Sequence, residues 1–305
     1  MSLRSFFLFL AVALLFGACE PQQKADSAEQ ESKAGEQKVE GFFSAMPTNA
    51  GEQQKQNAVR RPTAVSSQSV TPAGGNTRLM ELPATTRGER VISHTGYMLS
   101  FNATTLCPNW VAWELTASET RGHLDRSRDF FPDESVPAAQ RVTTSDYSGS
   151  GYTRGHMCPA ADMEWGAKPL HDCFLMSNMC PQTEELNRYS WEALERACRR
   201  WARKEGAVLI VCGPIFDNER KQKTIGRKHK VRVPDAFFKC VLSMRKGHEK
   251  GIAFIYKNNR AEQDMKECAT TVDAVEQLTG YNFFVNVSDA LEERLERQCN
   301  LSAWH

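Results

Sequence analysis

The sequence predicts an α+β fold for most of the chain, from about Asn76 to the C-terminus. Short runs rich in β-branched and aromatic residues alternate with only a few long helical patterns, and no internal repeat of solenoid length is present. The chain has 305 residues, of which 41% are hydrophobic, so it has enough apolar content for a core. This composition excludes a wholly disordered or collagen-like chain.

Six short runs have the composition of β-strands. They are Val91–His94, Tyr97–Asn102, Trp110–Leu115, Ala207–Cys212, Ala236–Leu242 and Ile252–Tyr256. The clearest helical pattern runs from about Glu184 to Lys204, where apolar residues recur at i, i+3, i+4 and i+7 and arginines lie opposite. The apolar positions are Leu194, Ala197, Cys198 and Trp201. Two further helices are predicted over Met265–Leu278 and Ser288–Gln298.

The N-terminus has the pattern of an export signal. Arg4 precedes an apolar run, Phe6–Phe16, that is too short to span a bilayer, and two small residues then lead to Cys19. This resembles a bacterial lipoprotein signal, in which residues 1–18 are removed and Cys19 is lipidated, although Phe16 stands where such signals usually have Leu. The alternative is ordinary secretion with Cys19 incidental. Both interpretations predict export, and the first predicts a lipid anchor in the bacterial cell envelope, periplasmic or at the cell surface.

Residues 19–75 are predicted to be a disordered tether. From Glu20 to Gly75 there is no Leu, Ile, Trp or Tyr, so the segment cannot bury enough apolar surface to offset the entropy cost of ordering it. Seven acidic and six basic residues leave it close to neutral. The remaining residues, 76–305, form the predicted α+β domain, and no other stretch is long and apolar enough for a transmembrane helix.

Residues with catalytic chemistry concentrate between Tyr152 and Arg203. The segment Tyr152–Asp162 follows a predicted β-hairpin, and Ser177–Gln182 leads into the helix that contains Asn187. Together they supply a proton acceptor, amide oxygens for a hard cation and guanidinium groups for phosphate. The candidate site residues are His156, Arg154, Asn178, Asn187, Glu195 and Arg199.

The segment Thr153–His156 is similar to the Asp-Arg-Gly-His signature of the DNA/RNA non-specific endonucleases, which belong to the ββα-metal (His-Me finger) class. The similarity covers roughly Gly88 to Ala290. It includes the blocks Trp110–Leu115, Gly213–Phe216, Val233–Lys239 and Thr279–Phe284. The resemblance implies a central antiparallel sheet flanked by helices, with a ββα-metal core. It also implies Mg²⁺-dependent, sequence-independent cleavage of DNA and RNA to 5′-phosphorylated products.

The same resemblance assigns roles to residues of the long helix and of the signature. His156 would be the general base that activates water, and Asn187 would bind one Mg²⁺, with Mn²⁺ or another divalent cation as alternatives. Glu195 lies eight residues beyond Asn187, ~12 Å along an ideal helix, so it would act on the metal through water. Arg199, one turn further on, could pair with Glu195.

Two arginines match phosphate-binding positions of the family. Arg128 matches an arginine that contacts phosphate, although Arg126 is close enough to leave that match open, and Arg154 is the arginine of the signature. A guanidinium group can bind two phosphate oxygens at once and stabilise the transition state. Asn178 is expected to order the site through hydrogen bonds rather than to bind the metal.

Thr153 is the main departure from the family pattern, because it stands where the signature has aspartate. This removes a carboxylate from the metal's surroundings and puts metal affinity and rate in doubt. Asp162, the nearest downstream carboxylate, is a candidate to compensate. The alternative function is a surface lipoprotein that binds nucleic acid and whose nuclease site has weakened.

The net charge of the whole chain is +1, but residues 196–232 contain twelve basic and three acidic side chains. Such a stretch would attract the phosphate backbone without recognising base edges, so its binding should weaken with salt. The residues predicted to bind nucleic acid are Arg200, Arg203, Lys221, Lys223, Arg227, Lys228 and Lys230. Homodimers occur among similar proteins, but no feature of the sequence decides the oligomeric state.

Nine cysteines follow Cys19, and in an exported protein we expect most of them to form disulfides, with at least one left over in a monomer. The connectivity is not predicted. The alternative is a zinc site, although the spacing matches no standard zinc pattern. Its candidate ligands are His156, Cys158, His171, Cys173 and Cys180.

Overall fold

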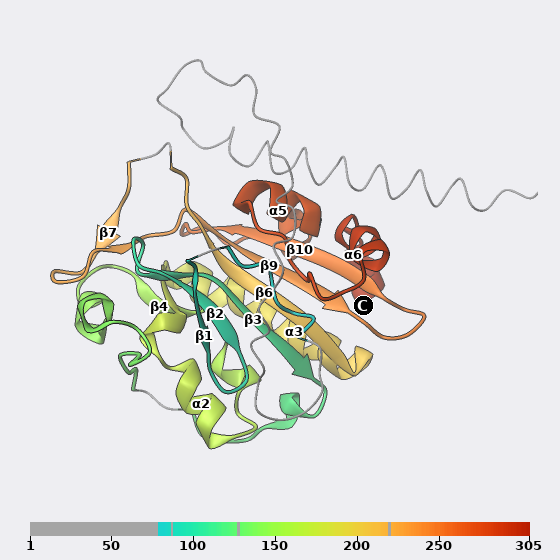
Figure 1. Cartoon of the computed structure of the whole chain (residues 1–305), viewed down its shortest axis with the longest axis horizontal. Helices are drawn as coiled ribbons and strands as arrows, with labels where there is room; N and C mark the ends of the chain where they lie inside the picture. Colours follow the sequence, from blue (N-terminus) through green and yellow to red (C-terminus); the bar gives the residue numbers. More distant parts are fainter. Residues whose placement is uncertain (1–78, 87, 127–128, 219–220) are drawn as a thin grey trace, which may run out of the picture.

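The computed structural model describes residues 79–86, 88–126, 129–218 and 221–305. The predicted signal, the tether, Cys19 and Arg128 lie outside these residues. The strands of the main sheet are β1 (Arg90–Ser93), β2 (Met98–Asn102), β3 (Cys107–Thr116), β6 (Ala207–Ile215), β9 (Ala236–Ser243), β10 (Lys250–Lys257) and β11 (Ala269–Thr270). They pair antiparallel in the order β1-β2-β3-β6-β9-β10-β11 (Figure 1). The α+β prediction and all six predicted strands are confirmed.

Two small antiparallel ribbons and several helices surround this sheet. The ribbons are β4 (Thr153–His156) with β5 (Met179–Gln182), and β7 (Thr224–Ile225) with β8 (Val231–Arg232). The α-helices are α2 (Ala167–Cys173), α3 (Glu192–Glu205), α4 (Met265–Cys268), α5 (Val272–Thr279) and α6 (Asp289–Glu296). A π-helix, η6 (Leu186–Trp191), precedes α3, and the 3-10 turns are η1 (Glu119–Arg121), η2 (Ala138–Gln140), η3 (Thr144–Asp146), η4 (Ala160–Asp162), η5 (Met176–Asn178) and η7 (Leu301–Trp304). Within the described residues, no helix is long and apolar enough to cross a membrane.

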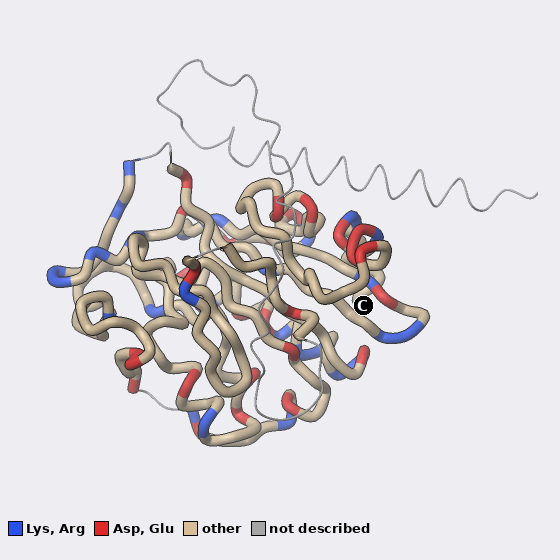
Figure 2. The backbone as a smooth tube through the Cα atoms, viewed as in Figure 1, with Lys and Arg blue, Asp and Glu red and all other residues tan. Residues whose placement is uncertain are grey.

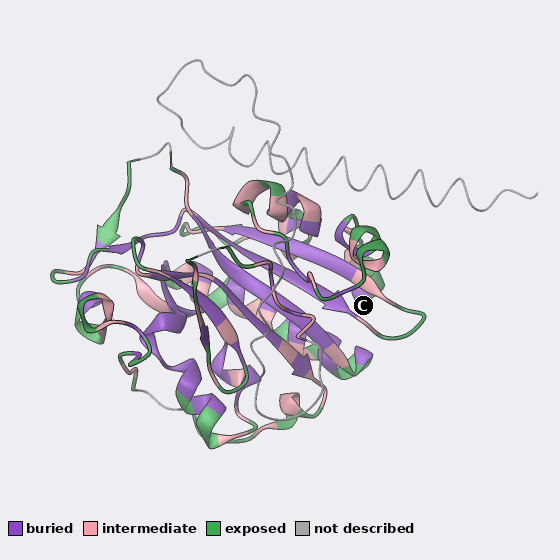
Figure 3. Ribbon diagram, viewed as in Figure 1, coloured by how far each residue is buried: buried purple, intermediate pink, exposed green. Residues whose placement is uncertain are grey.

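Helices cover both faces of the sheet, and this explains why its strands are apolar almost throughout. Successive side chains of a strand point to opposite faces. Trp113 and Ile210 belong to the core under α3, whereas their neighbours Ala112 and Val211 belong to the core under α5 and α6. The central strands are accordingly buried along most of their length (Figure 3).

The long helix predicted from Glu184 to Lys204 is present, with its predicted apolar face buried against the sheet. Its first part is a π-helix that contains Asn187, which the apolar spacing did not predict. Single π-helical turns within longer helices are frequent at functional sites. The helix ends at Gly206, whose φ of 94° favours a residue without a side chain.

The prediction of one helix over Met265–Leu278 is wrong. Strand β11 interrupts it, and Ala269 and Thr270 pair with β10. A new helix, α5, then begins at a Thr271 cap, whose hydroxyl accepts a hydrogen bond from the Ala274 amide at 3.1 Å. Two consecutive threonines favour an extended strand followed by an N-cap, so local chemistry prevailed over helical periodicity.

Gly155 allows β4 to lie close to the side chain of Gln182 on the neighbouring strand. A Cβ atom at Gly155 would lie 2.0 Å from Gln182 Oε1. The Gln182 side chain is fully buried, and its two terminal polar atoms have no hydrogen-bond partner among the described residues. The glycine of the Arg-Gly-His motif is therefore required by packing directly beside His156.

We predict that Gly155→Ala lowers the free energy of unfolding by about 1–3 kcal/mol, because the added methyl group overpacks the buried ribbon. Urea denaturation measures this cost. In a Gln182→Ala background the same change should cost less than about 0.5 kcal/mol, because the clashing atoms are absent. An equal cost in both backgrounds would contradict this explanation.

Candidate active site

A pocket of about 370 Å³ lies where β4 and its following turn meet η6 and α3. It brings together five of the residues that the sequence selected. They are Thr153, His156, Asn187, Glu195 and Arg199. Its other lining residues are Arg126, Pro159, Ala160, Ala161, Glu184, Arg188 and Glu192.

His156 ends β4 and is 5% exposed. Its backbone carbonyl accepts a hydrogen bond from Trp191 Nε1 at 3.3 Å, which ties the strand to the π-helix. Burial, together with the smaller effect of the Arg126 and Arg154 charges, lowers the pKa of His156 to about 3. The imidazole is therefore neutral at pH 7 and able to accept a proton.

Two aromatic rings pack against His156, and two arginines lie over the same rings. The rings of Phe130 and Phe174 lie 5.5 and 5.0 Å from the imidazole, between centroids. The Arg154 guanidinium lies 4.3 Å from the Phe130 centroid, and that of Arg126 lies 5.7 Å from the Phe174 centroid. Arg126 also lines the pocket. The structure therefore gives a pocket position to Arg126, the arginine that left the match of Arg128 open, while Arg128 itself lies outside the described residues.

The Thr153 hydroxyl orients the amide of Asn187. Asn187 Nδ2 donates to Thr153 Oγ1 at 3.0 Å, and this hydroxyl donates to the carbonyl of Gln182 at 3.1 Å. With Nδ2 occupied, Oδ1 is the atom of the amide that can serve as a ligand in the pocket. Thr153, which stands where the signature has aspartate, thus helps to position the Asn187 amide.

Asn178 is fully buried and connects three backbone groups. Its Oδ1 accepts from the Cys158 amide, and its Nδ2 donates to the carbonyls of Cys158 and Cys173, each at 2.9 Å. Its own carbonyl accepts from the amide of Met157, the residue after His156. Asn178 does not line the pocket, so the geometry supports an ordering role for it.

Lys239 is a buried cation that contacts the helix lining the pocket, and the sequence analysis did not select it. It is 1% exposed, and its Nζ lies 4.4 and 5.3 Å from the ring centroids of Trp191 and Trp113. Burial raises the pKa of Glu195 to about 7, and the charges of Lys239 and Arg199 oppose this shift. The only signal in the sequence was a lysine within the apolar run of β9.

Arg199 pairs with Asp162 and not with Glu195, which corrects the i, i+4 prediction. Its Nη1 donates to Asp162 Oδ1 at 2.9 Å, while Asp162 Oδ2 accepts from Trp113 Nε1 at 3.1 Å. Both oxygens of this buried carboxylate therefore have partners, and Asp162 does not line the pocket. It holds Arg199 in place rather than replacing the aspartate that is missing at Thr153.

The basic stretch 196–232 divides into two separate groups. Arg200 and Arg203 lie near the end of α3, and β6 then crosses the sheet for nine residues, ~30 Å, before the β7–β8 hairpin. The hairpin lies beside the pocket strand, because Lys223 Nζ donates to Tyr152 Oη at 2.8 Å. Figure 2 shows basic residues, in blue, along this hairpin and the segment that leads into it, and the exposed ones are Lys221, Lys223, Arg227, Lys228 and Lys230.

Seven of the domain cysteines are buried free thiols, which contradicts the expectation of disulfides for them. They are Cys107, Cys158, Cys173, Cys180, Cys198, Cys212 and Cys240. Cys173 Sγ donates to the carbonyl of Leu170. Across the part of the chain that the structure describes, no three histidine or cysteine side chains lie close enough to hold a metal, so the zinc alternative has no support.

Residues 75–290 match the family model of the DNA/RNA non-specific endonucleases. A nuclease from Nostoc sp. is 37% identical over 212 residues, which cover 66% of this chain and 75% of that protein. Human mitochondrial endonuclease G is 31% identical over 207 residues, covering 64% and 69%. A crystal structure of the EndoG/EndoGI complex, which describes EndoG inhibition, matches with a TM-score of 0.62 and 30% identity, over 66% of this chain and 87% of that one. The chain therefore belongs to the DNA/RNA non-specific endonuclease family, whose members are metal-dependent nucleases.

Proposed function

We propose that this nuclease cleaves DNA and RNA without sequence preference, uses Mg²⁺, and leaves 5′-phosphorylated products. The observation that supports this most directly is the shared pocket of His156, a neutral imidazole, and Asn187, an oriented amide. We also propose that the protein is exported and anchored by lipid at Cys19, which rests on the sequence of the first 19 residues alone.

The residues of the pocket fit a hard divalent cation. Asn187 offers an amide oxygen held in place by Thr153, and Glu195 contributes a carboxylate to the same pocket. Mg²⁺ is typically bound by one or two protein oxygens, with water and substrate phosphate completing its shell. When bound, the metal would stabilise negative charge on the phosphate and on the leaving oxygen.

His156 takes the proton from the attacking water in this proposal. A phosphate in the pocket would offset the charges of Arg126 and Arg154, and so would raise the low pKa of the imidazole toward the working pH. Arg126 and Arg199 line the pocket and would contact phosphate oxygens, while Arg154 stays stacked on Phe130 nearby. The phosphate-binding role proposed for Arg128 rests on the sequence alone.

The second candidate function is binding of nucleic acid by a protein that has lost most of its cleavage activity. The observation that favours it is the threonine at position 153, where the family signature has aspartate. The hydroxyl retains a contact with Asn187 but supplies no charge to the metal's surroundings. Metal-dependent cleavage of plasmid or RNA distinguishes the two functions.

We predict that His156→Ala lowers the rate of supercoiled plasmid cleavage by about 10²–10⁴-fold, because a general base contributes on this order. Agarose gels of plasmid and of RNA, each with and without EDTA, measure the loss. His248→Ala is the control, since His248 is exposed on the β9–β10 turn. Wild-type binding without chelator-sensitive cleavage would establish the second candidate, and unchanged cleavage by His156→Ala would exclude the proposed base.

We predict that Thr153→Val raises the Mg²⁺ concentration for half-maximal cleavage about tenfold or more, because Asn187 loses the acceptor that orients it. Thr153→Ser keeps the hydroxyl and should restore the wild-type Mg²⁺ dependence. Titration of cleavage rate against MgCl₂ separates this effect from a change in the maximal rate. If the valine and serine variants have the same Mg²⁺ dependence, the hydroxyl contact is irrelevant to metal binding.

We predict that nucleic acid crosses the β7–β8 hairpin and not the end of α3. In a His156→Ala background, replacing Lys221, Lys223 and Lys230 with Gln should lower the slope of log affinity against log salt by about 2–3, because each phosphate contact contributes about 1. Replacing Arg200 and Arg203 with Gln is the matched control and should change this slope by less than about 1. Fluorescence anisotropy with labelled duplex DNA at several salt concentrations measures both slopes. The reverse result would place the binding surface on α3.

A further inference from the structure

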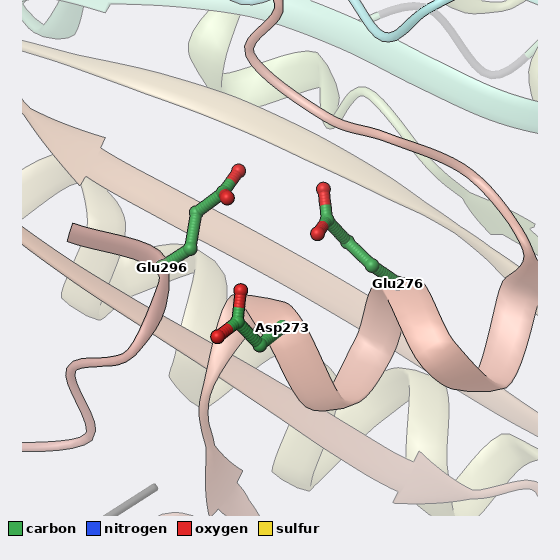
Figure 4. A group of neighbouring side chains, drawn as sticks. All are labelled: Asp273, Glu276 and Glu296. Carbon is green, nitrogen blue, oxygen red and sulfur yellow. The ribbon is translucent and has the colours of Figure 1, made fainter. Parts of the chain in front are cut away.

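Three carboxyl groups converge between α5 and α6, away from the active-site pocket. Potential ligand oxygens of Asp273, Glu276 and Glu296 all lie within 4.8 Å of one another. Asp273 and Glu276 come from α5 and Glu296 from the last position of α6, and their carboxyl groups point toward a common space (Figure 4). Both helices pack on the face of the sheet opposite α3, so this cluster is separate from the nuclease site.

Glu296 provides evidence beyond the grouping of acids. It is 2% exposed, and its Oε1 is buried without a hydrogen-bond partner among the described residues. An unpaired polar atom at such a depth is costly and is normally satisfied by a ligand, an ion or water. Figure 4 shows this side chain directed into the cluster.

Arg297 lies beside the cluster and is shared with a carboxylate outside it. The Nε atom of Arg297 lies 3.8 Å from Asp273 Oδ2, but the same guanidinium also pairs with Glu293. Burial and the neighbouring carboxylates together raise the pKa of Glu296 to about 10, and a hydrogen bond with the Glu276 side chain contributes in the same direction. Glu296 also ends a helix, where the helix dipole disfavours negative charge. A bound cation would offset each of these costs.

We propose that Asp273, Glu276 and Glu296 form a Ca²⁺ site that joins α5 to α6. The donors are all carboxylate oxygens, which select hard cations. One oxygen of Glu276 already accepts from the Phe283 amide at 2.6 Å, and the three carboxylates come from two separate helices. Ca²⁺ tolerates irregular arrangements of six to eight oxygens, whereas Mg²⁺ requires a near-ideal octahedron. The ion would stabilise the C-terminal helices without taking part in cleavage.

The test measures the melting temperature of the full chain in the Asn187→Ala background, so that metal binding at the nuclease site does not contribute. After removal of metal with EDTA and dialysis, 10 mM CaCl₂ should raise the melting temperature by about 3–5 °C for a dissociation constant near 1 mM. The same concentration of MgCl₂ should produce less than half of this rise.

Adding Glu296→Gln should abolish the Ca²⁺-dependent rise, and Glu276→Gln should do the same while keeping an acceptor for the Phe283 amide. Both variants should melt at least as high as their parent without Ca²⁺, because each removes a carboxylate from a crowded site. Glu262→Gln, an exposed glutamate outside the cluster, is the matched control and should keep the full rise. The proposal is overturned if Ca²⁺ gives no rise in the parent, if the rise persists in both cluster variants, or if Mg²⁺ matches Ca²⁺. Because Asn187 is absent throughout, none of these outcomes depends on the proposed nuclease mechanism.

Discussion

The burial of the Lys239 charge in the centre of the sheet constrains everything built above it. Removing an ammonium group from water costs several kcal/mol, so nearby negative charge and aromatic faces must offset the cost. Trp113 and Trp191 supply the faces, and the charges of Glu195 and Asp162 favour the protonated lysine. Glu195 belongs to α3 and Trp191 to the preceding π-helix. Contacts and charges around one buried cation therefore link this helix, which lines the pocket, to the centre of the sheet.

The pocket consequently holds two titratable groups whose pKa values are shifted in opposite directions. Burial lowers the pKa of His156 and raises that of Glu195, so burial favours the neutral form of both. Cationic side chains lie near both groups: Arg126 and Arg154 add to the shift of the imidazole pKa, whereas Lys239 and Arg199 oppose the shift of the carboxyl pKa. A neutral base beside Arg126 and Arg154 suits an anionic substrate, because a bound phosphate would offset the part of the pKa shift that these arginines cause. Separated pKa values of this kind are typical of acid and base assignments in enzymes.

The features that could be predicted from the sequence are those governed by periodicity and short-range chemistry. The six strands and the apolar face of α3 follow from spacing alone, and the resemblance selected five residues that meet in one pocket. The partner of Arg199 could not be predicted, because helical spacing offers Glu195 while the fold brings Asp162 from a turn 37 residues earlier. Lys239 was missed for a related reason. A lysine within an apolar strand can be recognised as part of a site only when its partners in other elements are known. The basic stretch was continuous in sequence, but β6 carries its two halves to opposite ends of the sheet.

The substitution of Thr153 for the signature aspartate separates two tasks that a single carboxylate could perform. One is to hold the Asn187 amide so that its oxygen is available, and a hydroxyl linked to the Gln182 carbonyl does this with neutral hydrogen bonds. The other is to add negative charge near the metal, which threonine cannot do. Glutamates at positions 184, 192 and 195 line the same pocket, but the first two pair with Arg188 and Arg196. Glu195 has no such pairing with Arg199, because Asp162 takes that arginine. The ion pair between Asp162 and Arg199 therefore leaves Glu195 as the carboxylate best placed to supply the missing charge, from the helix rather than from the strand.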